Sequence, residues 1–112
     1  MDSRFDMSAI YKNVVKCFAY LSLIIELSKG RKITGYDILV QVKSYGLEVS
    51  PGTIYYQLGI LEKSGIIRSS QVIRSNASKT VYEITDKGMK VFKEFKDKWE
   101  EPLRYVYRNI VG

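Results

Sequence analysis

The sequence predicts a mainly α-helical domain with one small β-hairpin. Apolar residues recur at helical spacing in three segments before residue 65 and again after residue 86. Between these helices, residues 66–85 are rich in Ile, Val, Thr and Tyr and alternate with a period of two, which is typical of paired strands. A chain of 112 residues has room for one hydrophobic core, and the sequence contains no internal repeat or linker.

The first helix is predicted over residues 8–29. Ser8 can serve as its N-cap, and Gly30 follows its last turn, where a left-handed residue is favoured. The apolar stripe of this helix consists of Ile10, Val14, Cys17, Phe18, Leu21, Ile24 and Ile25. We expect Cys17, the single cysteine, to be buried in this stripe as a small hydrophobic residue.

Two shorter helices follow, joined by a three-residue turn. Thr34 and Asp37 resemble a capping box at the start of the first of these helices. Ser50 is the expected N-cap of the other, and Pro51 occupies its first position, where the missing N–H costs nothing. A glycine follows each helix and ends it.

The hairpin is predicted from strands at residues 66–74 and 79–85. Between them, the sequence Ser-Asn-Ala-Ser at 75–78 favours a turn. We therefore expect the two strands to pair in antiparallel fashion.

A last helix is predicted from about residue 86 onward, which divides the chain into a domain at 1–85 and a C-terminal helix at 86–112. Pro102 lies inside this helix and cannot donate a hydrogen bond to the carbonyl of Lys98. We expect a kink near Pro102, or a break followed by a second short helix.

The positive charge of the chain is concentrated in its middle. The net charge is +6, and residues 29–79 carry +5 of it, because eight basic residues stand there against three acidic ones. The acidic residues of the C-terminal stretch alternate with lysines, as on solvated helix faces. This distribution indicates a polyanion as the partner of the middle segment.

The composition argues against several classes of protein. Because the chain has no histidine and one cysteine, we expect no zinc site, no cofactor and no Ser-His or Cys-His catalysis, and we find no constellation of an enzyme. The start of the chain does not read as a secretory signal, and no apolar run reaches the roughly 18 to 20 residues that a membrane span needs. We expect a cytoplasmic protein that does not enter a membrane.

The predicted order of two short helices and a hairpin describes a winged helix-turn-helix, which places its second short helix in the major groove of DNA. The narrow apolar seam of that helix is Ile54, Leu58 and Leu61, so most of its circumference is free to face outward. On its outer surface we expect Gly52, Thr53, Tyr56, Gln57, Ile60 and Lys63. For contacts to the DNA backbone or minor groove we expect the wing residues Arg68, Arg74, Ser75, Asn76 and Lys79, and the earlier residues Lys32, Thr34 and Tyr36.

Four motifs, in this order and spacing, resemble the PadR family of transcriptional regulators. They are Ile-Thr-Gly-Tyr-Asp-Ile at 33–38, Val-Ser-Pro-Gly-Thr-Ile-Tyr at 49–55, Leu-Glu-Lys-Ser-Gly-Ile-Ile at 61–67 and Tyr-Glu-Ile-Thr-Asp-Lys-Gly at 82–88. The resemblance spans about residues 10–95.

This resemblance implies a short-form regulator with a single C-terminal helical region, through which it forms a homodimer. It further implies a repressor that binds a pseudo-palindromic operator in double-stranded DNA, and some members release DNA when a small aromatic effector binds. By the same resemblance, Ser50, Thr53, Tyr55 and Tyr56 belong to the DNA surface, and Tyr36 lies against the DNA backbone.

The last helix carries a long aromatic stripe that one small domain cannot cover. Its members are Met89, Phe92, Phe95, Trp99, Leu103, Val106 and Ile110. We expect a two-fold dimer to bury this stripe, with Phe5, Met7, Ile10 and Tyr11 of the first helix as a partner surface. Such a dimer sets two recognition helices about 34 Å apart, which is one turn of DNA. The stripe can instead line a pocket for a small aromatic effector.

Two other functions are compatible with this pattern. A sequence-tolerant architectural DNA-binding protein fits the modest polarity of the third helix. A winged-helix module for protein–protein assembly fits the fold, although the basic middle segment argues against it. Binding to selected and to random DNA sequences separates the three functions.

Overall fold

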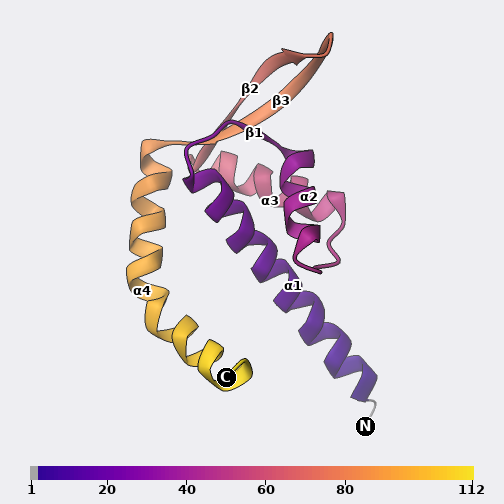
Figure 1. The fold of residues 1–112 in the computed structure, drawn as a ribbon, viewed down its shortest axis with the longest axis vertical. Coiled ribbons are helices and arrows are strands. Elements are labelled where there is room, and N and C mark those ends of the chain that lie inside the picture. Colours follow the sequence, from indigo (N-terminus) through magenta and orange to yellow (C-terminus); the bar gives the residue numbers. More distant parts are fainter. Residues whose placement is uncertain (1–2) are drawn as a thin grey trace.

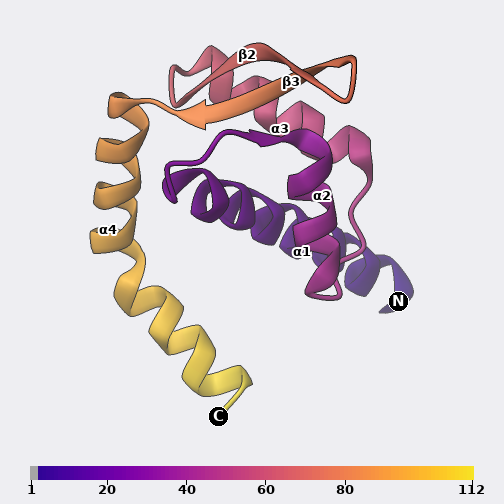
Figure 2. The same cartoon turned by 45° about the horizontal axis from the view of Figure 1, so that its top comes forward.

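A computed structural model describes residues 3–112 of the chain, with side chains from residue 8 onward (Figure 1). In chain order the elements are α1 (Ser3–Ser28), β1 (Ile33–Thr34), α2 (Gly35–Ser44), α3 (Pro51–Lys63), β2 (Ile67–Arg74), β3 (Ala77–Ile84) and α4 (Asp86–Ile110). Helices α1 to α3 pack together, the sheet lies at one end of them, and α4 extends away from the sheet (Figures 1 and 2). The mainly α-helical fold class with a small hairpin is confirmed.

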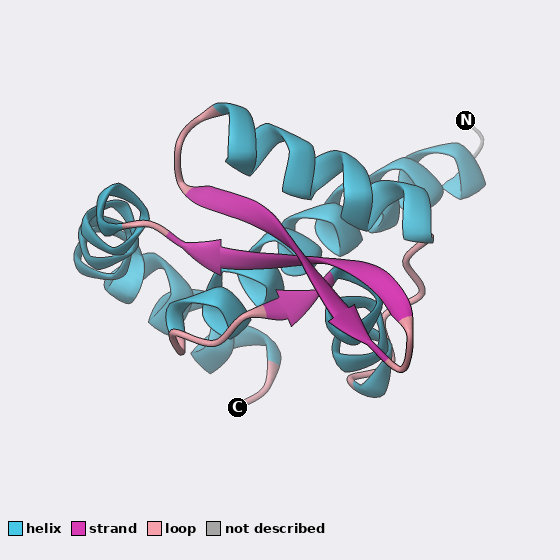
Figure 3. Cartoon of the chain, turned by 90° about the horizontal axis from the view of Figure 1, so that it is seen from above, coloured by secondary structure: helices cyan, strands magenta, loops and turns pink. Residues whose placement is uncertain are grey.

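The sheet has three antiparallel strands in the order β1-β3-β2, one strand more than the sequence predicted. β1 is only two residues long and pairs Ile33 with Tyr82, and so short a strand leaves no alternation in the sequence. β2 and β3 pair from Ile67, opposite Ile84, up to the tip of the hairpin. Seen from above, the sheet lies over the helices (Figure 3).

The hairpin turn is tighter than predicted. Arg74 pairs with Ala77, so the loop between the strands consists of Ser75 and Asn76 alone. Both loop residues have left-handed backbone angles, with φ of 52° and 62°. Two successive left-handed residues are the signature of a type I′ turn, whose twist matches that of the flanking strands.

The core joins all three helices of the domain to the sheet. Its buried apolar members are Val15, Ala19, Leu23, Leu27, Ile33, Ile38, Leu39, Val42, Val49, Ile54, Leu58, Leu61 and Ile67. The predicted helix starts are confirmed where the cap is local: the Thr34–Asp37 capping box opens α2, and Ser50 caps α3 with Pro51 in its first turn.

The apolar face that α1 buries differs from the predicted stripe. The core face is Val15, Ala19, Leu23 and Leu27, whereas Ile10, Val14, Phe18 and Ile25 are exposed. Cys17 is exposed rather than buried, and Ser8 lies inside a helix that begins at Ser3 rather than capping it. The prediction was wrong because α1 is apolar on two sides, and periodicity alone does not say which side the domain covers.

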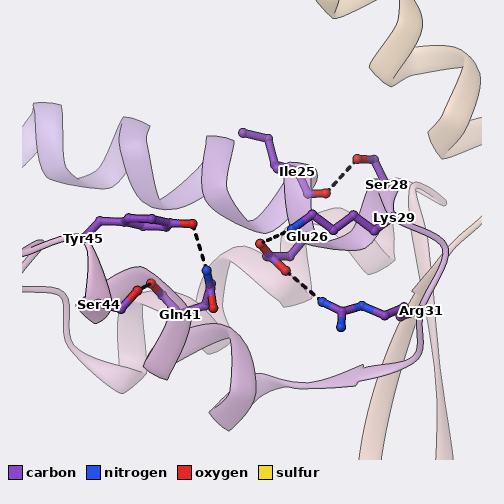
Figure 4. Close-up of polar contacts among 8 residues, drawn as sticks. All are labelled: Ile25, Glu26, Ser28, Lys29, Arg31, Gln41, Ser44 and Tyr45. Atoms are coloured by element: carbon purple, nitrogen blue, oxygen red, sulfur yellow. Dashed lines mark hydrogen bonds and ion pairs between the residues drawn. The ribbon is translucent and has the colours of Figure 1, made fainter.

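Glu26 is a buried carboxylate near the end of α1, 4% exposed. Lys29 Nζ lies 2.9 Å from one of its oxygens and Arg31 Nη2 lies 3.2 Å from the other (Figure 4). A buried charge is tolerated when it is paired, so the two cations compensate Glu26. These ion pairs hold the segment after α1 against the end of that helix. They also place Arg31 beside the start of α2.

Helix α4 begins against the domain and then leaves it. Gly88 is its buried residue, and a Cβ there would collide with the carbonyl oxygen of Ile66 and the side chain of Ile84. The helix continues through Pro102 to Ile110, and its axis changes direction partway along (Figures 1 and 2). From Val91 on, the described residues of α4 are exposed or only partly buried.

Among the described residues, one segment, Ser8–Ser28 of α1, is long and apolar enough to cross a membrane, with a mean hydropathy of 1.3. A core helix of a folded domain passes the same test. Ala19, Leu23 and Leu27 of this segment are at most 1% exposed and belong to the core, so a membrane crossing would dismantle the domain. That the chain stays out of the membrane remains a prediction.

The two helical glycines Gly88 and Gly59 are expected to respond oppositely to alanine. Gly88→Ala should lower the free energy of unfolding by about 1 to 3 kcal/mol, because the new Cβ overlaps backbone. At Gly59, a Cβ meets nothing within 4 Å, so Gly59→Ala should raise the free energy of unfolding by up to about 1 kcal/mol. Urea unfolding measures both, and equal effects would contradict the close approach of α4 at Gly88.

Candidate nucleic-acid interface

The start of α3 is held by a local cap. Ser50 Oγ accepts a hydrogen bond of 3.2 Å from the backbone N–H of Thr53, and the Ser50 and Thr53 hydroxyl oxygens lie 3.0 Å apart. Pro51 and Gly52 are exposed, so the first turn of α3 is open to solvent. A helix N-terminus in this setting favours an anionic group such as a phosphate.

The outer face of α3 is aromatic. Tyr56 is 69% exposed, Tyr55 is half exposed, and Ile60 lies on the rim of the same surface. Lys63 is exposed in the last turn. These residues lie where the sequence predicted them.

Gln57 is the exception, and its predicted place on the DNA surface is wrong. Its side chain is 2% exposed and packs on the inner face of α3 with Ile54, Leu58 and Leu61. The amide Nε2 donates a hydrogen bond of 3.0 Å to the carbonyl of Lys16 in α1. Polarity suggested the outer surface, but position 57 lies one helical turn from both Ile54 and Leu61 and belongs to the apolar seam.

Tyr55 joins α3 to the start of α2. A Cβ built on Gly35 would lie 2.5 Å from Cε1 of the Tyr55 ring, so the ring lies directly over the glycine. The glycine at position 35 is therefore required by the close approach of the two helices. Tyr36, the next residue, is exposed beside this contact.

The start of α2, Tyr55 and the wing surround one hollow of about 390 Å³. Its lining includes Tyr36, Tyr55, Arg74 and Lys79, four predicted contact residues from three separate elements. Tyr82 also lines it, and burial, with Glu62 and Tyr55 nearby, raises the pKa of its hydroxyl. Like any tyrosine hydroxyl at neutral pH, it is protonated and can donate a hydrogen bond to an anion.

A neighbouring hollow adds a residue that sequence analysis missed. Its lining includes Arg31, Lys32, Tyr36 and Arg74. Arg31 is part of the basic pair Arg31-Lys32, which was the available signal, although the sequence does not show that Glu26 anchors it. Both hollows share Tyr36, Asp37 and Arg74, so they form one continuous surface. Its cations without an ion pair among the described residues are Lys32, Arg74 and Lys79, because Glu26 already compensates Arg31.

The basic side chains of the wing differ in how they are paired. Arg68 Nε donates to Glu83 Oε1 at 2.9 Å across the two strands, and this arginine lowers the pKa of the Glu83 carboxyl. Its charge is thus already compensated within the wing. Arg74, Ser75 and Asn76 are exposed at the tip. The wing surface available to a polyanion is therefore centred on its tip.

Comparison with known proteins points to one family. The family model described as "Transcriptional regulator PadR-like family" matches residues 24–94. The protein named Transcriptional regulator Rv3488, from Mycobacterium tuberculosis, is 29% identical over 83 residues, which cover 74% of this chain and 78% of that protein.

Solved structures agree. A PadR family transcription regulator from Clostridium difficile has a TM-score of 0.71 at 23% identity, over 85% of this chain and 99% of that chain. A PadR-like transcriptional regulator from Bacillus cereus has a TM-score of 0.66 at 27% identity, over 88% of this chain and 92% of that chain. The first structure shows that this chain has the winged-helix fold. The second has the same fold and is more similar in sequence to this chain.

The contact between Gly35 and Tyr55 is testable by a double-mutant cycle. Gly35→Ala alone is expected to cost about 1 to 3 kcal/mol of unfolding free energy, because the methyl group overlaps the ring. In a Tyr55→Ala background the same change should cost less than half as much. Tyr55→Phe is the matched control, since it keeps the colliding ring carbons and should give no relief. Equal costs in all three backgrounds would refute the contact.

Proposed function

Because the chain belongs to the PadR-like family of transcriptional regulators, as its motifs predicted, we propose that it is a sequence-specific DNA-binding repressor that acts as a homodimer in the cytoplasm. One observation carries this proposal. Tyr36, Tyr55, Arg74 and Lys79 come from the second helix, the third helix and the wing, and all line the same hollow. Donors gathered from three elements suit a phosphate of the DNA backbone.

In the proposed complex, α3 enters the major groove with its open first turn ahead. Tyr56 is the main groove contact, because it lies on the side of α3 opposite the buried seam. Thr53 is half-buried one helical turn before Gln57, so it would reach DNA from the edge of that seam. Ser50, Gly52 and Lys63 flank them, and Thr34 and Lys32 support the backbone contact of Tyr36. The wing tip, with Arg74, Ser75 and Asn76, follows the adjacent backbone or minor groove.

The homodimer of the proposal uses the apolar surface that one protomer leaves uncovered. Trp99, Leu103, Val106 and Ile110 of α4 are each at least 46% exposed, and Tyr11 of α1 is exposed as well. Met89, Phe92 and Phe95 continue the α4 stripe and are partly buried. A surface of this kind is covered by a second copy in soluble two-fold dimers. The side chains of Phe5 and Met7, also expected there, lie outside the described residues.

The small aromatic effector stays a prediction. The hollows described above are lined by α1, α2, α3 and the wing, and neither includes a residue of α4. We propose that a pocket built on the aromatic stripe forms at the interface with the second protomer.

Selection from a random DNA pool tests the function directly. The wild type is expected to enrich a pseudo-palindrome with half-site centres about 34 Å apart, and enrichment of no sequence would leave an architectural or assembly role. Tyr56→Ala should weaken discrimination against random duplex by about 1 to 3 kcal/mol, the usual worth of one base contact. Tyr45→Ala is the matched control. Tyr45 is about as exposed as Tyr56 but lies at the C-terminal end of α2, away from the proposed DNA surface, so its replacement should leave discrimination unchanged.

Two wing arginines are expected to differ in their effect on DNA affinity. Arg74→Ala should weaken binding to every sequence and reduce the salt slope by about one, because it removes a cation that forms no ion pair with the described residues. Arg68→Ala should have a smaller effect, since Glu83 already compensates that charge. Fluorescence anisotropy at several salt concentrations measures both slopes. A larger effect of Arg68→Ala would contradict the placement of the wing tip on DNA.

The proposed dimer is tested on α4. Leu103→Glu together with Val106→Glu is expected to give a folded monomer, because both side chains are exposed and lie outside the core. Arg108→Glu, about half a helical turn away from the stripe, serves as the control and should remain dimeric. Sedimentation velocity gives the oligomeric state, and circular dichroism checks the fold. A wild-type chain that sediments as a monomer would remove this part of the proposal.

A further inference from the structure

Gln57 provides a directional contact between α1 and α3. Its Nε2 donates to the carbonyl of Lys16, 41 residues earlier, at 3.0 Å. The other contacts of this face of α3 are made by Ile54, Leu58 and Leu61, which are apolar. Apolar contacts are not directional, whereas a hydrogen bond requires a defined angle and distance.

The amide of Gln57 is poorly explained as a stabilising group. Its Oε1 is buried and has no hydrogen-bond partner among the described residues. A buried acceptor without a partner costs free energy, and an apolar side chain of the same length avoids that cost. The orientation of the amide is nevertheless set, because turning it over would place Oε1 against the Lys16 carbonyl oxygen.

The residue before Gln57 is Tyr56, the most exposed aromatic side chain on α3. Tyr20 of α1 has a raised pKa, caused by its burial and by the proximity of Tyr56. Tyr56 directly precedes Gln57, and Tyr20 lies one helical turn after Lys16, so Tyr56 is beside the crossing of α1 and α3 that the Gln57 hydrogen bond spans. Any rotation of α3 at this crossing changes the direction in which Tyr56 points.

We propose that Gln57 is a positioning residue, whose hydrogen bond to the Lys16 carbonyl fixes the rotation of α3 against α1 and so aims Tyr56 at DNA. The inference rests on the proposed DNA-binding function. It also connects two surfaces, since α1 carries exposed Ile10, Val14 and Phe18 on its outer side.

The test uses Gln57→Met in the full-length chain, with Leu58→Met as the matched control. Both variants place a methionine on the buried face of α3, but only the first removes the hydrogen bond. Three quantities are measured: the thermal midpoint, the affinity for the sequence selected by the wild type, and the affinity for random duplex. Gln57→Leu is made in parallel, as a second apolar replacement.

The expected result for Gln57→Met is a thermal midpoint equal to or above that of the wild type. Its affinity for the selected sequence should fall by roughly 2- to 30-fold, the range seen when a residue acts without touching the ligand. Its affinity for random duplex should be unchanged, and Leu58→Met should keep both affinities.

Two outcomes overturn the inference while leaving the proposed function standing: both Gln57 variants bind the selected sequence like the wild type, or they lose selected and random binding together in proportion to the unfolded fraction. A wild type that prefers no sequence refutes the proposed function itself, and with it the positioning role.

Discussion

The packing of the inner face of α3 is the constraint on which the rest of the structure depends. Ile54, Gln57 and Leu58 are at most 2% exposed, and together they turn Tyr55 and Tyr56 outward. Because the Tyr55 ring lies over Gly35, the same packing brings the start of α2 close to α3. The hollow shared by α2, α3 and the wing is a consequence of that arrangement. The surface proposed for DNA and the core packing thus lie on opposite sides of a single helix.

The molecule leaves its two long helices unevenly covered. α1 buries one apolar side in the domain and exposes the other, while α4 makes its close contact at Gly88 and then extends outward. Uncovered apolar surface is costly in water, and this cost favours a second copy of the chain. The basic and aromatic surface has no such cost, because its charged groups are hydrated when nothing is bound to it. The described chain thus separates an exposed apolar surface, where we propose the dimer, from a basic and aromatic surface, where we propose DNA binding.

Local signals in the sequence predicted local structure well. The side chains of Thr34 and Ser50 each accept a hydrogen bond from the backbone N–H three residues later. Short sequence motifs therefore suffice to place the starts of α2 and α3. The hairpin and its approximate strands followed from alternation and turn chemistry. β1 was missed because its two residues become a strand only by pairing with β3. The family, too, could be recognised from its motifs, because they follow one another in a set order.

By itself, the sequence determined which segments are helical, where the hairpin lies, and that the basic charge belongs to the middle of the chain. Only the tertiary structure decided which side of each helix is covered. It exposed Cys17, buried Gln57 against the Lys16 carbonyl, paired Arg68 with Glu83 and left Arg74 free to join Tyr36 and Tyr55. The physical reason is that helix formation depends on neighbours within four residues, whereas burial and charge pairing depend on which distant surfaces meet.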